Sequence, residues 1–180
     1  MTAVALVSIA LLPGSARGTT LRPMDLAELA LEASVILHGR VVEVRPEWVR
    51  GGRQIDSVVT VEVETLFKGE PARRVSFLSP GGQIGVYRTV VPGAPELAPG
   101  AEVVLFLAPS GADRTTSVVG LSQGVLKVLR DASGPKRVRA PFLVPGLVEA
   151  HLPARIALTL PELAEQLARI HAAARSRGRR

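Results

Sequence analysis

Short segments rich in valine and isoleucine recur about every ten residues along this chain, separated by turns rich in glycine and proline. The clearest segment covers residues 55–67, in which Val59, Val61 and Val63 alternate with Thr60, Glu62 and Glu64. A two-residue period places one set of side chains in a core and the other in solvent. No helical pattern separates these segments, so the sequence disfavours a doubly wound α/β fold and predicts antiparallel β structure.

The fold class that we predict is mainly β: a small antiparallel OB-like barrel, or a sandwich, with a short N-terminal helix and a C-terminal helix. The expected strands cover residues 34–45, 55–67, 74–78, 83–90, 102–107, 118–121, 125–129 and 137–142. Gly39 predicts a bulge or bend in the first strand. Asp25 and Glu28 have capping-box spacing for a helix over residues 23–33. A second helix begins at Leu160-Pro161 and carries Leu163, Leu167 and Ile170 on one face.

The first residues resemble an export signal. An uncharged apolar run from Ala3 to Leu12 is followed by a Pro-Gly-Ser break and by small residues at 16 and 18, although no basic side chain precedes the run. We therefore expect a signal peptide over residues 1–18, a β-barrel domain over 19–143, and an irregular segment, C-terminal helix and basic tail over 144–180. A buried N-terminal strand or helix is the alternative. Export implies a periplasmic or extracellular location, and we expect no transmembrane helix after signal removal.

The chain has no cysteine, which excludes disulfides, zinc–thiolate sites, iron–sulfur clusters and cysteine nucleophiles. Residues 1–130 carry 13 Lys and Arg against 12 Asp and Glu, whereas residues 131–180 carry 9 against 4. The excess positive charge is therefore concentrated in the C-terminal part, where four of the last six residues are arginines. A near-neutral body with 3% aromatic residues disfavours nucleic acid as a partner, and we expect no cofactor.

Residues 24–130 resemble a group of uncharacterised bacterial exported proteins. The resemblance rests on LAELALEASVILHGRVVEV (26–44), TVEVETLFKG (60–69), PGG (80–82), VPGAP (91–95), PGAEVVLFL (99–107) and GLSQG (120–124). The group brings no established activity with it. The same layout is similar, more loosely, to netrin-like and tissue-inhibitor-of-metalloproteinase-like domains, which are OB-type barrels. Those inhibitors use cysteines, including one at the N-terminus that chelates the protease zinc, and this chain has none.

Candidate binding residues lie in three loops and on two aromatic side chains, the only tryptophan and the only tyrosine of the chain. Glycine-rich rim loops allow backbone amides to approach a ligand, and an exposed tryptophan can anchor a partner. The favoured alternative for Trp48 is that it packs against one end of the barrel. The candidates are Trp48, Gly81, Gly82, Gln83, Tyr87, Pro92, Gly93 and Gln123.

No catalytic or metal-ligating set is predicted. His38, His151 and His171 lie in different elements without ligand spacing, and there is no H-E-x-x-H segment. The paired carboxylates Glu62 and Glu64 are interpreted as a solvated strand face.

We therefore predict an exported, non-catalytic binding or protein-interaction module whose partner is an unknown protein or envelope component. The first alternative is an inhibitor or accessory domain of a secreted metalloprotease. The second alternative is an uncharacterised hydrolase that uses Glu62, Glu64 or His38; convergence of those three in one pocket would favour it.

Overall fold

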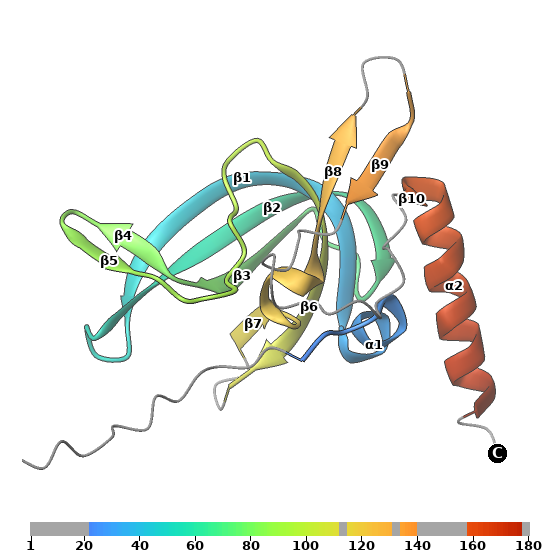
Figure 1. Cartoon of the computed structure of the whole chain (residues 1–180), viewed down its shortest axis with the longest axis horizontal. Coiled ribbons are helices and arrows are strands. Elements are labelled where there is room, and N and C mark those ends of the chain that lie inside the picture. Colours follow the sequence, from blue (N-terminus) through green and yellow to red (C-terminus); the bar gives the residue numbers. More distant parts are fainter. Residues whose placement is uncertain (1–21, 112–114, 131–133, 140–157, 178–180) are drawn as a thin grey trace, which may run out of the picture.

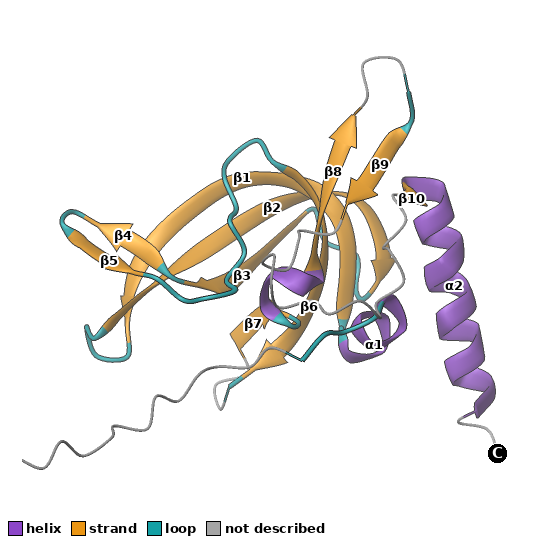
Figure 2. Cartoon of the chain, in the orientation of Figure 1, coloured by secondary structure: helices purple, strands orange, loops and turns teal. Residues whose placement is uncertain are grey.

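The computed structural model describes residues 22–111, 115–130, 134–139 and 158–177. The predicted signal peptide, His151 and most of the irregular segment after residue 143 lie outside these ranges. Figures 1 and 2 show a strongly curved sheet with two helices on one side. The elements are α1 (Leu26–Glu32), β1 (Val35–Val49), β2 (Gln54–Lys68), β3 (Arg74–Pro80), β4 (Gly82–Ile84), β5 (Tyr87–Thr89), β6 (Glu102–Ser110), β7 (Thr115–Val118), the 3₁₀-helix η1 (Leu121–Gly124), β8 (Val125–Arg130), β9 (Lys136–Arg139), β10 (Leu158–Thr159) and α2 (Leu160–Arg177).

The mainly β, barrel-like prediction is confirmed. The main sheet has the order β1-β2-β3-β7-β6-β8-β9-β10, and an additional β1–β6 pairing closes a ring of five strands. All pairings in this ring are antiparallel except β3–β7, which is parallel and has one bridge, Leu78 with Ser117. The ring β1-β2-β3-β7-β6 is therefore OB-like, and β8, β9 and β10 extend the sheet beyond it.

Gly39 allows β1 to take part in two pairings. The first half of β1 pairs with β6 and its whole length with β2, and the β1–β2 register shifts between His38 and Gly39. A Cβ atom at Gly39 would lie 2.3 Å from the carbonyl oxygen of Glu62, so no larger residue fits. The predicted irregularity occurs at this position, but the extra residue of the bulge is Glu64 on β2, opposite the His38–Gly39 step, and not Gly39 itself. Beyond the bulge β1 and β2 continue together as a long arm that ends at the turn Arg50–Arg53.

Strand β6 is buried on both faces, as its apolar run predicts. Val103, Leu105 and Leu107 point into the ring, where they join a cluster that includes Leu37, Val59, Val61 and Phe77. The intervening Val104 and Phe106 face outward into a second cluster. That second cluster contains Leu29 and Ala30 of α1 and Leu163 and Leu167 of α2. Helix α1 covers the outer face of β6, and α2 packs against α1, β9 and β10. Both predicted helices are confirmed, including the Asp25–Glu28 capping box, although α1 is shorter than the predicted range. Leu163 and Leu167 are buried as predicted, and Ile170 is half-buried.

Several predicted element boundaries were wrong. Residues 83–90 form a hairpin of β4 and β5, because Gly85 has a φ of +59° and turns the chain in the middle of the run. Strand β7 ends at Val118, since Gly120 and Leu121 both adopt positive φ and open η1. Strand β9 begins one residue earlier than predicted, at Lys136, and pairs with both β8 and β10.

Candidate functional site

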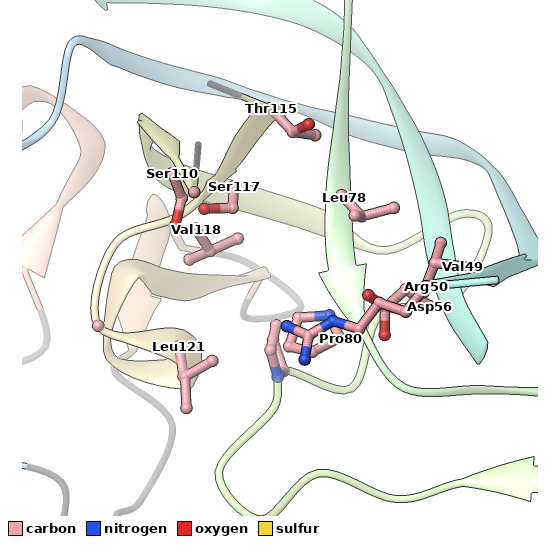
Figure 3. Close-up of a pocket in the computed structure, with 13 residues that line it drawn as sticks. Val49, Arg50, Asp56, Leu78, Pro80, Ser110, Thr115, Ser117, Val118 and Leu121 are labelled. Atoms are coloured by element: carbon pink, nitrogen blue, oxygen red, sulfur yellow. The ribbon is translucent and has the colours of Figure 1, made fainter. Parts of the chain in front are cut away.

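A cleft of about 480 Å³ opens where β3 and β7 diverge after their single bridge. Figure 3 shows side chains from the ends of β1, β2 and β3 on one side of the opening and side chains from β7 and η1 on the other. The lining residues are Val49, Arg50, Asp56, Leu78, Pro80, Pro95, Ser110, Gly111, Thr115, Ser117, Val118, Gly120 and Leu121. The volume falls within the range of small-molecule and peptide-side-chain pockets.

The cleft combines apolar walls with a few polar groups. Leu78, Val118 and Leu121 supply apolar surface, and hydroxyl groups of Ser110, Thr115 and Ser117 follow one another along the β6–β7 wall. Arg50 and Asp56 are the two charged residues of the lining. Asymmetric linings of this kind orient a ligand through its polar groups and gain affinity from its apolar ones.

Asp56 holds one edge of the cleft in place. It is buried, and its Oδ1 accepts hydrogen bonds from the side-chain amide of Gln54 at 2.7 Å and from the backbone N–H of Gly81 at 3.1 Å. The hydroxyl of Ser57 donates to the carbonyl of Gly81 at 2.8 Å. Both polar groups of the Gly81 peptide backbone are thereby fixed, so the chain leaves β3 in a defined direction.

The three predicted rim loops converge beside this cleft. Pro80 and Pro95 line it directly, and Gly120 and Leu121 complete its border. The N–H of Ser122 donates to the carbonyl of Gly93 at 3.0 Å, which joins the third loop to the second. Of the predicted loop residues Gly81, Gly82, Gln83, Pro92 and Gly93, none lines the cleft itself, but each lies in a segment that borders it.

Two of the predicted binding residues have structural contacts. A Cβ atom at Gly82 would lie 2.8 Å from the Ser57 hydroxyl, so this glycine lets β4 pack on the arm. Gln123 is buried; its Oε1 accepts from the N–H of Met24 at 2.8 Å and its Nε2 donates to the carbonyl of Arg22 at 3.1 Å. The Gln123 amide thus tethers the segment before α1, and we leave it out of the site proposed below.

Trp48 and Tyr87 form a separate feature. Their rings meet edge to face, with centroids 5.6 Å apart, and both side chains are exposed. Trp48 lies near the end of β1 and Tyr87 begins β5, so the pair links the arm to the hairpin. Neither residue lines the cleft, although Val49 and Arg50, which follow Trp48, do.

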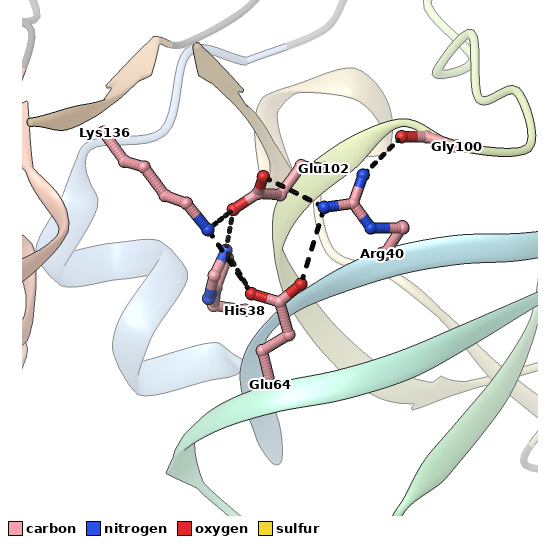
Figure 4. A network of polar contacts seen from close by, with 6 residues as sticks. All are labelled: His38, Arg40, Glu64, Gly100, Glu102 and Lys136. Carbon is pink, nitrogen blue, oxygen red and sulfur yellow. Dashed lines mark hydrogen bonds and ion pairs between the residues drawn. The ribbon is translucent and has the colours of Figure 1, made fainter. Parts of the chain in front are cut away.

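A polar network that was not predicted from the sequence spans four strands (Figure 4). His38 is buried, and its Nε2 lies 2.7 Å from Glu102 Oε1 and 3.7 Å from Glu64 Oε2. The Lys136 ammonium lies 2.5 Å from Glu102 and 3.5 Å from Glu64. Arg40 reaches the second oxygen of each carboxylate and donates to the carbonyl of Gly100.

Positive side chains in the network compensate the negative charges of its two carboxylates. Burial alone would raise the pKa of Glu102, but hydrogen bonds from Lys136 and His38, together with their charges, hold this pKa below its ordinary value. His38, Glu64 and Glu102 could each offer one ligand atom to a metal ion. The Lys136 ammonium, however, already contacts both carboxylates, and with Arg40 it supplies two positive charges for the two negative ones.

The predicted pairing of Glu62 with Glu64 on one solvated face is not what the structure has. The β1–β2 register skips Glu64, which is therefore the bulged residue and turns its carboxylate toward His38 and Arg40. Glu62 instead lies 3.7 Å from Arg73. His171 is on α2, with its Nε2 3.4 Å from the carbonyl of Ala30. The sequence did contain one signal for this network. His38 lies within an apolar strand, and a buried histidine needs a polar partner.

Comparison with protein-family models, with curated proteins and with solved structures gives no match for this chain. The resemblance of residues 24–130 to exported bacterial proteins therefore stays a prediction, as does the looser similarity to netrin-like domains.

Proposed function

We propose that the chain is a non-catalytic protein-interaction module that binds its partner in the cleft between β3 and β7. The observation that carries this proposal is the position of the cleft on the ring. OB-type barrels commonly bind ligands on the face of their second and third strands, between the loop that joins the first two strands and the loop that joins the last two. In this chain those elements are β2 and β3, the Arg50–Arg53 turn and the β6–β7 connection, and all of them contribute to the lining. The link from position to binding is an analogy between folds.

The lining favours an extended peptide segment over a glycan or a nucleic acid. Binding of sugars and single-stranded nucleic acids relies on aromatic rings for stacking, and the lining contains no aromatic residue. Leu78, Val118 and Leu121 suit aliphatic side chains of a partner, whereas the hydroxyls of Ser110 and Ser117 can pair with its main chain. Arg50 supplies a guanidinium for a carboxylate of the same segment.

The two alternative functions, a hydrolase and a protease inhibitor or accessory domain, have less support than a binding module. Hydrolysis through Glu62, Glu64 and a histidine needs these groups to converge, and Glu62 lies apart from the His38–Glu64–Glu102 network. Within that network each carboxylate contacts a lysine and an arginine, an arrangement typical of a structural ion cluster. For inhibition of a secreted protease, no arrangement within the residues that the structure describes gives specific support. We retain export to the periplasm or beyond as part of the proposal, with a protein of that compartment as the partner.

Selection from a displayed library of random peptides tests this function. We expect selected peptides to share aliphatic positions and to shift backbone NMR signals of residues 49–50, 78–80, 110–111 and 115–121 in the labelled protein. Cleavage of the selected peptides by the protein would contradict a non-catalytic role. If no peptide is selected and glycan fragments shift the NMR signals of the cleft, the ligand is a glycan and the proposed peptide ligand is wrong.

A further inference from the structure

The β4–β5 hairpin and the neighbouring Trp48 present a concentrated apolar surface. Four of the seven large hydrophobic side chains that are exposed in the described part of the chain lie here: Trp48 (44% exposed), Val86 (91%), Tyr87 (63%) and Val90 (68%). We call these four residues the hairpin surface. Figure 1 shows the hairpin beside the distal end of the β1–β2 arm, away from α1 and α2. Exposed apolar groups gathered in this way commonly mark an interaction site.

The charge around the hairpin surface is positive. Residues 48–55 and 81–93 contain three arginines and neither aspartate nor glutamate. Two of these arginines, Arg53 and Arg88, are exposed, and neither forms an ion pair with any residue that the structure describes. The third, Arg50, lines the cleft. The hairpin surface is therefore complementary to a partner that is both apolar and anionic.

We propose that the hairpin surface docks the protein onto an anionic membrane surface. Tryptophan and tyrosine favour the boundary between lipid headgroups and acyl chains, where one part of the ring is dry and the other wet. Val86, almost fully exposed at the hairpin turn, is placed to enter this boundary first, while Arg53 and Arg88 contact lipid phosphates. This inference does not depend on the proposed peptide cleft.

A second copy of the chain is a poorer occupant. The unpaired edge of β5 could in principle pair with the same edge of another molecule. β5 has three residues, Tyr87–Thr89, and a two-fold axis through its centre would set Arg88 opposite Arg88. Like charges directly opposite each other destabilise a strand pair. On an anionic lipid surface, by contrast, Arg88 would contact lipid phosphates, which is favourable.

Trp48 makes the test direct, because it is the only tryptophan of the chain. Purified protein, with the same termini in every variant, is titrated with vesicles of phosphatidylcholine and phosphatidylglycerol, and with vesicles of phosphatidylcholine alone. We expect a blue shift of Trp48 emission, and quenching by lipids brominated near the headgroup, with the mixed vesicles and much less with the neutral ones. Higher salt should weaken the effect.

Matched variants locate the contact. Val86→Ser with Val90→Ser should lower the partition coefficient by at least about tenfold, since each apolar CH₂ group contributes about a fourfold factor. Arg53→Gln with Arg88→Gln should lower it by about thirtyfold, about fivefold for each arginine near an anionic surface. The control pairs are Val42→Ser with Leu129→Ser, which removes apolar groups exposed elsewhere, and Arg175→Gln with Arg177→Gln, which removes charge from the last turn of α2.

The proposal is supported if the hairpin variants lose binding and both control pairs keep it. It is overturned if Trp48 emission is unchanged by anionic vesicles, or if the control pairs lose as much binding as the hairpin variants. A blue shift that appears without vesicles and grows with protein concentration would also overturn it, in favour of self-association. Because the peptide selection uses no lipid, its failure would leave this result unaffected.

Discussion

Replacing Glu102 by glutamine removes the central negative charge of the polar network while keeping the size of the side chain. Glu102 is 12% exposed, accepts from His38 at 2.7 Å and from Lys136 at 2.5 Å, and lies 3.5 Å from Arg40. These partners come from β1 and β9, so the carboxylate connects the ring to the strands that extend it. The variant therefore tests whether the network stabilises the barrel.

The magnitude follows from the two hydrogen bonds. A hydrogen bond to a charged group contributes about 1.5–3 kcal/mol, and a neutral one about 0.5–1.5 kcal/mol. The amide oxygen of glutamine can still accept a hydrogen bond but carries no negative charge, and the Glu102→Gln variant also avoids burying a charge. We therefore expect the free energy of unfolding to fall by about 1–3 kcal/mol at neutral pH. The control Glu64→Gln, in a side chain that is 36% exposed with ion pairs of 3.5 Å or longer, should cost less than about 1 kcal/mol.

The contribution of Glu102 to the free energy of unfolding should depend on pH. The pKa of Glu102 is lowered in the folded protein from its ordinary value of 4.5, so the unfolded chain binds this proton more readily. The stabilisation by Glu102 is fully present above pH 4.5 and is lost as the pH falls through the lowered folded pKa. Urea unfolding of the wild type and of Glu102→Gln should differ most at neutral pH and converge in acid. A difference below about 0.5 kcal/mol, or one that stays constant into acid, would refute this reasoning.

Three further predictions concern the fold and the network. Gly39→Ala should destabilise the protein by about 1–3 kcal/mol or more in urea unfolding, because the new Cβ would lie 2.3 Å from the Glu62 carbonyl oxygen; wild-type stability would show that the bulge is not needed. Leu167→Ala should lower the free energy of unfolding by about 2–5 kcal/mol, since Leu167 lies on the buried face of α2, whereas the exposed control Glu165→Ala should lower it by less than about 0.5 kcal/mol. Equal losses would mean that α2 does not pack on the rest of the fold. Added Zn²⁺ should leave the Tm of the wild type unchanged, because the Lys136 ammonium contacts both carboxylates of the network; a dose-dependent rise in Tm would identify a metal site.

The elements with strong periodicity were predictable from the sequence. Alternation in residues 58–62 and the apolar run 102–107 report burial on one face and on both faces of a strand, so local patterning was sufficient there. The alternation does not extend to residues 55–57, which are all buried, or beyond the bulge at Glu64. Turns that lie inside a continuous run of strand-like residues were not predictable. Residues 83–90 have strand-like composition throughout, and only the positive φ of Gly85 divides them into β4 and β5.

The candidate sites were predictable only in part. The glycine- and proline-rich loops could be identified as rims, because their composition requires turns. The polar network could not be predicted, because its members come from β1, β2, β6 and β9 and meet only after the ring closes. Glu64 joins it through a bulge that shifts the register by one residue, and a single-residue shift reverses the direction of a side chain.

The cleft between β3 and β7 is the proposed binding site, and blocking it is the most direct test of the proposed function. In the Ser117→Phe variant a ring is placed between Leu78 and Val118, at the single β3–β7 bridge, while the backbone pairing of β6 and β7 is retained. The measurement is a calorimetric titration of wild type and variant with a peptide selected on the wild type. We predict that the variant, still folded by circular dichroism, loses at least about tenfold in affinity. Equal affinity in a folded variant would show that the peptide binds elsewhere and would contradict the proposed role of the cleft.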